Sequence, residues 1–303
     1  MKLTVENINE KIAFSAKDYI CECEENYRKK LEEIRDTINK SGEGRTVMLA
    51  GPSSSGKTTT ARILRQMLTE SGRNTVTVSL DDFYLDQKNA PVFPDGRPDF
   101  ETVHALDIQR ITHCLTEFSK EGKSVLPVFD FNLRKPSEKT NTVEIDKNGI
   151  IIVEGLHALN PLITKPIENE NMLKLYVSVS SRIFGKDDVI FTKRDIRFIR
   201  RMIRDYKFRN SPVDFTFYLW KAVRTGEDKY LFPFSGEADI KIDSIHPYEL
   251  SVYRNRALEL LSHIEKDSTY FRRAQELKEK LSLMRELDRS DVPENSLLHE
   301  FIG

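Results

Sequence analysis

The sequence reads GPSSSGKT from Gly51 to Thr58. This stretch follows an apolar run at residues 46–50 that predicts a buried strand, and it opens a pattern at residues 57–70 that predicts a helix. Two glycines, a lysine and a threonine at this spacing, between a strand and a helix, are typical of a phosphate-binding loop. The sequence therefore predicts a nucleoside-triphosphate site and a fold built on strand–loop–helix units.

Each fixed position of this loop has a chemical reason. Gly51 and Gly56 allow backbone conformations that turn successive N–H groups toward phosphate oxygens, and the following helix adds its positive dipole end. Lys57 brings a charge to the β- and γ-phosphates, and Thr58 offers its hydroxyl to Mg²⁺. The motif alone does not separate a kinase from a GTPase or a motor. The residues expected to hold the nucleotide are Gly51, Ser53, Ser54, Ser55, Gly56, Lys57, Thr58 and Thr59.

The composition is that of a well-solvated globular protein. The 303 residues are 39% hydrophobic and 31% charged, with a net charge of -1. This hydrophobic share is enough for a packed core, and the lack of a basic excess argues against a nucleic-acid partner. The N-terminus lacks the pattern of a signal peptide, and no apolar run approaches the roughly 20 residues of a membrane span. We therefore expect a cytoplasmic protein with no membrane partner.

The three cysteines, Cys21, Cys23 and Cys114, are too few for a disulfide framework, which suits a reducing compartment. Cys21 and Cys23 form a Cys-x-Cys pair, which allows a metal-binding interpretation. No second cluster of cysteine or histidine accompanies the pair, so we favour an ordinary helix position.

Strands and helices alternate along the chain. Strands are predicted at residues 75–80, 124–128, 150–153 and 173–179, a helix at 106–121, and a Pro-, Asp- and Gly-rich loop at 86–99. The alternation predicts an α/β fold of the P-loop type, with a doubly wound, mainly parallel sheet and flanking helices.

Helical extensions are expected on both sides of this core. Apolar residues recur every three or four positions from Ile12 to Ile38, which predicts a long amphipathic helix that ends at Ser41-Gly42-Glu43-Gly44. The region after Tyr248 is helical in pattern and highly charged. We expect an N-terminal helical extension at 1–44, a core at 45–247 with a lid around 193–211, and a C-terminal helical region at 248–303.

Acidic residues follow two of the predicted strands. Asp81 comes after the strand at 75–80, and Glu154 ends the hydrophobic run at 150–153. Carboxyl ends of neighbouring parallel strands face one crevice, so Asp81 can accept a proton from an attacking hydroxyl and Glu154 can hold Mg²⁺. The alternatives are a helix cap for Asp81 and a plain polar strand end for Glu154.

Residues 193–209 form a predicted basic helix with eight basic and two acidic residues. Arg197, Arg201 and Arg204 fall on one helical face because of their spacing. Beside a triphosphate site, such a face suits a lid that neutralises the transferring phosphoryl group. A basic helix can also bind nucleic acid or stay solvated, and the other motifs favour the lid.

Together these motifs resemble those of the phosphoribulokinase and uridine kinase family over roughly residues 45–243. GPSSSGKTT resembles the family's phosphate loop, SLDDFY (79–84) its catalytic-base segment, and PDFETVHALD (98–107) its acceptor-binding stretch. PVFDF (127–131) resembles the segment whose aromatics pack on the base, and VEGLHAL (153–159) the strand-end motif. RRMIRD (200–205) resembles the lid, and ADIKID (238–243) is similar to the last core strand.

The resemblance implies that the protein uses ATP and Mg²⁺ to phosphorylate the 5′-hydroxyl of a pyrimidine nucleoside. It implies that Asp81 is the catalytic base, assisted by Lys57, Arg201 and Arg204, and that Thr58 and Glu154 hold the metal. The substrate-binding residues that it implies are Asp81, Tyr84, Phe100, Glu101, Phe129, Phe131, Arg134, Arg201 and Arg209.

The sequence also departs from the family. Glu101 stands where uridine kinases carry aspartate, Arg134 falls near a base-reading histidine of some members, and Ser211 replaces a lid arginine. The segment DFTFYLWKAVRTGEDKYLFPF at 214–234 and both terminal helical regions differ from the shortest members. These departures leave a deoxynucleoside or a different sugar open as the acceptor.

Other classes of function share some of these features. A kinase for a phosphosugar or pantothenate would have the same phosphate loop. A nucleotide-sensing module would bind ATP without transferring phosphate, but Asp81, Glu154 and the lid arginines argue against it. A nucleic-acid-stimulated ATPase ranks last because the basic charge is confined to one helix. The sequence leaves homo-oligomer formation open.

Overall fold

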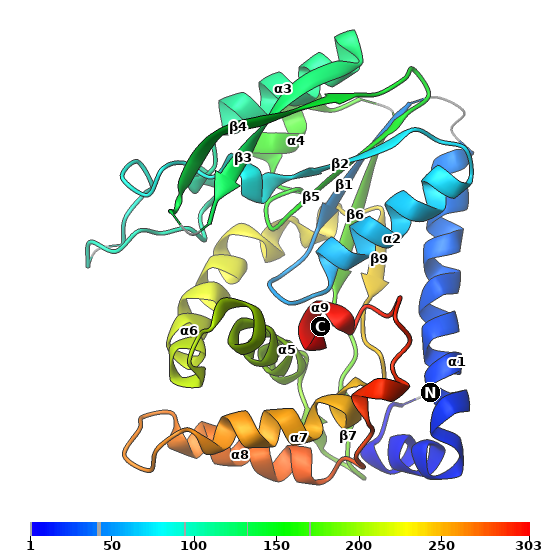
Figure 1. Cartoon of the computed structure of the whole chain (residues 1–303), viewed down its shortest axis with the longest axis vertical. Helices are drawn as coiled ribbons and strands as arrows, with labels where there is room; N and C mark the ends of the chain where they lie inside the picture. The colour runs from blue at the N-terminus through cyan, green and yellow to red at the C-terminus, as the bar shows by residue number, and fades with distance from the viewer. Residues whose placement is uncertain (1, 41–43, 94, 132, 170) are drawn as a thin grey trace.

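The computed structural model describes residues 2–40, 44–93, 95–131, 133–169 and 171–303. A five-stranded parallel sheet with the order β2-β5-β1-β6-β9 lies at its centre (Figure 1). These strands are β1 (Arg45–Ala50), β2 (Thr75–Ser79), β5 (Ile150–Gly155), β6 (Met172–Ser178) and β9 (Ile240–Asp243). The predicted α/β fold with a doubly wound, mainly parallel sheet is confirmed.

Alternating side chains of the strands enter two hydrophobic clusters, one on each face of the sheet. Val47 and Leu49 of β1 belong to the first cluster, whereas Met48 and Ala50 belong to the second. This period of two follows from the pleat of a strand, and a parallel strand covered on both faces is apolar throughout. The uninterrupted apolar runs of β1 and β5 in the sequence have this cause.

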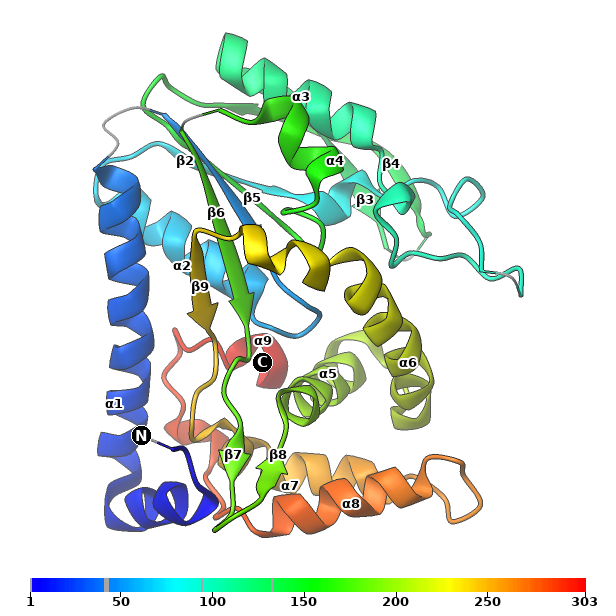
Figure 2. The same ribbon diagram turned by 180° about the vertical axis from the view of Figure 1, so that it is seen from behind.

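The helices that cover the sheet follow the strands in the expected alternation (Figures 1 and 2). The helix predicted at 57–70 has those bounds, and the basic helix predicted at 193–209 does too. The helices are α1 (Val5–Asn39), α2 (Lys57–Glu70), α3 (Ile108–Glu121), α4 (Pro161–Thr164), α5 (Lys193–Arg209), α6 (Val213–Tyr230), α7 (Glu249–Ser262), α8 (Phe271–Ser282) and α9 (His299–Ile302), with 3₁₀ turns at Leu80–Phe83, Val103–Ala105, Lys165–Ile167, Phe232–Glu237 and Arg289–Asp291.

Two small antiparallel pairs stand apart from the central sheet. One is formed by β3 (Lys123–Asp130) and β4 (Lys135–Glu144), and the other by β7 (Ile183–Phe184) and β8 (Val189–Phe191). The sequence predicted part of β3 but not β4. Most residues of β4 are exposed and polar, so the strand carries no apolar alternation from which it could be recognised.

The N-terminal helix α1 packs along the core as an amphipathic helix, as predicted. Its apolar face is buried, and a kink at Ser15 (φ -158°, ψ 99°) separates a short first part from the long second part. Tyr27 and Thr60 share a buried hydrogen bond of 2.6 Å that joins α1 to α2. Lys40 caps the helix; of the predicted terminator 41–44, residues 41–43 lie outside the described residues.

Both cysteines of the Cys-x-Cys pair lie in α1, in agreement with the interpretation that they occupy ordinary helix positions. Cys21 is exposed, and Cys23 is buried in the apolar face. Within the described ranges, no group of three or more His, Cys, Asp or Glu side chains could hold a metal ion, and no helix is long and apolar enough to cross a membrane.

The C-terminal region consists mainly of helices, as predicted. Apolar residues of α7, α8 and α9 join the same cluster as α1 and one face of the sheet. The division into an extension, a core and a C-terminal region stays a prediction, although all three contribute to one hydrophobic cluster.

A buried ion pair ties α5 to α7. Arg200 and Glu249 are both 0% exposed, and the guanidinium donates from Nε to Oε2 (2.6 Å) and from Nη2 to Oε1 (2.8 Å). Arg200 Nη2 also donates to the carbonyl of Ser244 at 2.8 Å. Because a buried charge is tolerated only with such partners, this pair fixes where α7 lies against α5.

Replacing Glu249 by alanine is expected to lower the free energy of unfolding by about 3–5 kcal/mol, since it leaves the Arg200 charge buried without its partner. Chemical denaturation measures this loss. The exposed pair Arg256–Glu259 offers a control, because Glu259→Gln should change stability by less than about 1 kcal/mol. Equal losses in the two variants would contradict the role given to the buried pair.

Candidate functional site

The phosphate loop connects β1 to α2, and its backbone has the unusual conformation that the motif requires. Ser54 (φ 58°) and Gly56 (φ 85°) both have positive φ, and Gly56 is the N-cap of α2. At Gly51, a Cβ atom would collide with the carbonyl oxygen of Val177 in β6. Positive φ and this close approach explain why glycine occupies both positions.

The strand register brings the expected acidic residues to the same edge of the sheet as the loop. Ser79 of β2 and Leu49 of β1 are both in register with Glu154 of β5. Glu154 is 4% exposed, and its pKa is raised by burial and by the nearby charge of Asp81, while the Lys57 charge acts in the opposite direction. The register thus places Glu154 beside the end of β2, two residues before Asp81, and the charges of Lys57 and Asp81 both act on the Glu154 carboxyl.

The oxygen atoms around Glu154 fit the predicted magnesium site. The Glu154 carboxylate accepts hydrogen bonds from Ser79 Oγ (3.0 Å) and Thr58 Oγ1 (3.4 Å), and the Thr58 side chain is otherwise exposed. Mg²⁺ prefers hard oxygen ligands and is commonly held by one or two protein oxygens together with nucleotide phosphates. A site of this kind needs no cluster of three acidic side chains.

The basic face of α5 lies against the phosphate loop. Arg201 Nη1 donates to Ser53 Oγ at 2.7 Å, and Arg197 Nε donates to the Ser53 carbonyl at 2.9 Å. Arg201, Arg204 and Arg209 also pair with Asp205, at 3.1, 2.9 and 3.4 Å, and Arg209 is exposed. Of the predicted lid arginines, Arg201 thus reaches the loop directly, and the other two lie one or two turns further along the helix.

Four aromatic residues from the predicted acceptor segments come together. Tyr84 lies with its ring centroid 5.8 Å from Phe100 and 5.8 Å from Phe129, and Phe129 is 5.1 Å from Phe131. Asp82 accepts the Phe129 N–H at 3.2 Å, which fixes the hairpin β3–β4 against the end of β2. The cluster provides an apolar wall of the kind that a planar base would need.

Arg134 is not brought into this cluster. It lies exposed in the turn between β3 and β4 with positive φ (52°), and its carbonyl accepts the Gln87 N–H. Within the part of the chain that the structure describes, no contact joins the Arg134 side chain to the aromatic rings. Its role in binding an acceptor stays a prediction.

Glu101 lies between the acceptor side and α6. Burial raises the pKa of Glu101 to about 7; the Arg201 charge lowers this pKa, and the charges of Glu227, Asp99 and Asp81 raise it. The Glu101 side chain packs against the Cα of Gly226, where a Cβ atom would overlap with it. A carboxyl group with such a pKa can both donate and accept hydrogen bonds near neutral pH.

The last helix, α9, contacts the phosphate loop from a distant part of the sequence. Glu300 accepts hydrogen bonds from Thr59 Oγ1 (2.7 Å) and from the Thr59 N–H (3.4 Å), and Leu297 covers Gly56. Phe301 lies with its ring 5.0 Å from the Arg200 guanidinium. Figure 1 shows α9, in red, beside α5 and the start of α2. Sequence reasoning missed these residues because no local motif marks them.

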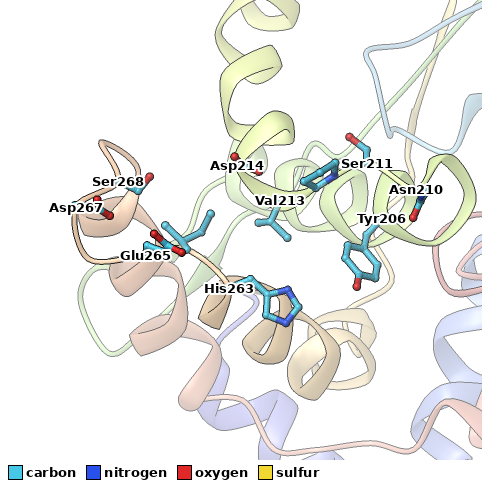
Figure 3. Close-up of a pocket in the computed structure, with 11 residues that line it drawn as sticks. Tyr206, Asn210, Ser211, Val213, Asp214, His263, Glu265, Asp267 and Ser268 are labelled. Atoms are coloured by element: carbon cyan, nitrogen blue, oxygen red, sulfur yellow. The ribbon is translucent and has the colours of Figure 1, made fainter.

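A separate cleft of about 540 Å³ lies at the far end of α5 (Figure 3). It is formed by Tyr206, by the α5–α6 corner at 210–214 and by residues 263–268 between α7 and α8. Asn210 in this corner has positive φ (48°). The α5–α6 corner is thus open to solvent on this side rather than packed against α7.

The parallel sheet, the phosphate loop after β1 and the acidic strand ends define a P-loop kinase fold. Residues 46–251 match the model of the Phosphoribulokinase / Uridine kinase family, and the chain belongs to this family.

Individual relatives agree with this assignment. A uridine kinase of Clostridium tetani is 29% identical over 64% of this chain and 84% of that protein. A uridine kinase of Bacillus licheniformis is 27% identical over 64% of this chain and 83% of that protein. The solved structure of YFH7 from Saccharomyces cerevisiae has a TM-score of 0.51 at 12% identity, covers 71% of this chain and 98% of that chain, and shows similarity of fold alone.

The raised pKa of Glu101 predicts a pH-dependent effect of Glu101→Gln on stability. A buried carboxyl with a pKa above its ordinary 4.5 favours folding when protonated, and this contribution is lost as the pH rises toward about 7. The variant should therefore gain more in Tm relative to wild type at about pH 8 than at about pH 5. Equal differences in Tm at both pH values would show that the Glu101 charge carries no such penalty.

The contact of Glu300 with Thr59 predicts an effect on nucleotide binding. The motif assigns the Thr59 donors to a nucleotide phosphate, so a carboxylate on the same donors competes with it and repels its charge. Glu300→Gln should lower the Kd for ATP by roughly fivefold, the factor that corresponds to about 1 kcal/mol. Calorimetric titration measures this Kd, with the exposed Glu294→Gln as the control. Weaker ATP binding in Glu300→Gln would refute the competition.

Proposed function

We propose that the protein transfers the γ-phosphate of ATP to the 5′-hydroxyl of a pyrimidine nucleoside of the uridine type. The observation that carries this proposal is the contact of Thr58 in the phosphate loop with Glu154, together with the strand register that puts Glu154 level with Ser79, two residues before Asp81. The aromatic cluster of Tyr84, Phe100, Phe129 and Phe131 supports a planar acceptor next to this edge, because Asp81 and Tyr84 belong to the same turn after β2.

In this proposal the phosphate loop holds the triphosphate through its backbone N–H groups, with Lys57 at the β- and γ-phosphates. Asp81 accepts the proton of the acceptor hydroxyl as the phosphoryl group moves in line. Arg201 stabilises the charge that develops on the phosphoryl group, and its contact with Ser53 supports this role. When bound, Mg²⁺ would neutralise phosphate charge, held through Thr58 and Glu154.

The residues around the acceptor, rather than the phosphate loop, distinguish a nucleoside from the other acceptors considered. Glu101 would bind sugar hydroxyls, and the aromatic residues would stack on the base. A phosphosugar or pantothenate would use the same phosphate loop but would gain nothing from an aromatic wall. A module that only senses nucleotide would have no use for Asp81 beside Lys57.

A phosphotransfer assay with a panel of acceptors tests the substrate class. Ribonucleosides, deoxyribonucleosides, phosphosugars and pantothenate are incubated with ATP and Mg²⁺, and the products are identified by mass. The expected product is a pyrimidine nucleoside 5′-monophosphate. Transfer to a phosphosugar or pantothenate instead would replace the proposed acceptor, and ATP binding without any transfer would favour the sensing module.

Replacing Asp81 by asparagine is expected to lower kcat by roughly 100-fold or more, because the acceptor hydroxyl loses its base. The Kd for ATP should change little. Asp82→Asn is the matched control: the amide oxygen can still accept the Phe129 N–H, so transfer should stay within a few-fold of wild type. Similar kcat values for Asp81→Asn and wild type would remove Asp81 from the mechanism.

A further inference from the structure

Helix α6 includes most of the segment 214–234 that differs from the shortest family members, and one of its residues is built into the site. Glu227 is 1% exposed, and its Oε1 accepts the Ser53 N–H at 2.9 Å. The same oxygen is paired with Arg197, whose Nε donates to the Ser53 carbonyl at 2.9 Å. Glu227 and Arg197 together therefore hold both backbone groups of Ser53 in the phosphate loop.

The second carboxylate oxygen of Glu227 has a different environment. Oε2 is buried, and among the described residues it has no hydrogen-bond partner. A buried carboxylate oxygen without a donor is costly and rare, so its presence next to the phosphate loop points to a donor that a ligand brings. A hydroxyl group of a substrate is a donor of the right kind.

The neighbouring residue links Glu227 to the acceptor side. Gly226 has no side chain, and the Glu101 side chain occupies the space that a Cβ would take, with Cγ 3.1 Å from the position of that Cβ. Glu227 directly follows Gly226 in α6, and its charge raises the pKa of the Glu101 carboxyl. A buried carboxyl group next to a half-buried one is most favourable when hydroxyl donors lie between them.

We propose that Glu227 is a specificity-determining residue: its Oε1 positions the phosphate loop, and its Oε2 accepts the 2′-hydroxyl of the acceptor sugar beside Glu101. The acceptor class that fits two neighbouring carboxyl groups carries two neighbouring hydroxyls, as a ribonucleoside does and a 2′-deoxyribonucleoside does not. Gly226 is the positioning residue that lets Glu101 approach. This inference rests on the proposed nucleoside kinase function and makes it more specific.

Glu227→Gln tests the role of Oε2 directly. Its amide oxygen is expected to face Ser53 and Arg197, since both are donors, which puts the amide NH₂ where Oε2 was. The substitution thus puts a hydrogen-bond donor where wild type has a carboxylate oxygen that accepts from the sugar hydroxyl. The kcat/KM for uridine should fall roughly 10- to 100-fold, as expected for losing a hydrogen bond to a charged group, while that for 2′-deoxyuridine should change by less than about threefold. The KM for ATP should stay near the wild-type value.

Two further variants separate this role from a merely structural one. Gly226→Ala should raise the KM for uridine and leave the Kd for ATP unchanged, because the new Cβ displaces Glu101 and not the phosphate loop. Asp228→Asn is the control, since Asp228 is exposed and pairs only with Arg194 at 3.4 Å among the described residues. It should alter neither the acceptor nor the ATP parameters.

The outcomes distinguish this inference from the function on which it rests. Equal losses of kcat/KM for uridine and 2′-deoxyuridine in Glu227→Gln, or no loss for either, would overturn the inference and leave the kinase function intact. If wild type phosphorylates no nucleoside, the proposed function fails. In that case, calorimetric titration with uridine in the presence of a non-hydrolysable ATP analogue tests the inference about Glu227. Binding of uridine to wild type that is abolished in Glu227→Gln supports the inference. Absence of binding to wild type overturns it.

Discussion

Three arginines of α5, buried against the phosphate loop, determine how the helical part of the molecule is arranged. Arg197 and Arg201 bind Ser53, and Arg200 donates to the Ser54 carbonyl at 3.4 Å. A buried guanidinium group is stable only with an acidic partner, and each of these three arginines pairs with a carboxylate. Those partners are Glu227 of α6, Glu249 of α7 and Asp205 of α5 itself. The places of α6 and α7 therefore follow from the need to neutralise charge around the loop.

Helix α2, which follows the phosphate loop, is contacted by both the N-terminal and the C-terminal helical regions. Tyr27 of α1 binds Thr60 on one side, and Glu300 next to Phe301 of α9 binds Thr59 on the other. The terminal helical regions are thus in contact with consecutive residues of the helix that carries the nucleotide site.

Local patterns were enough to predict four strands of the central sheet, α2, α5 and the acidic residues Asp81 and Glu154 at the strand ends, whereas β9 was predicted only from the family resemblance. The reason is topological: in a parallel sheet, residues that follow different strands meet at one edge, so their positions can be inferred without knowing their contacts. The aromatic cluster was predicted from a family resemblance, and the rings do lie together.

Other parts could not be predicted because their causes are not local. Strand β4 is polar and exposed, and its strand conformation comes from pairing with β3. Glu227 lies in a helix whose sequence gives no reason to prefer it over the exposed Asp228. Leu297 and Glu300 reach the loop only through the path of the whole C-terminal region, which no periodicity in the sequence describes.

The contact between Thr59 and Glu300 joins residues that are 241 positions apart in the chain. A ribosome adds roughly 5–20 residues per second, so Thr59 is made roughly 10 to 50 s before its partner. During synthesis, the nucleotide loop therefore exists first without α9 and without the α7 partner of Arg200. The Glu300 carboxylate is therefore among the last groups to reach the nucleotide site as the chain is made.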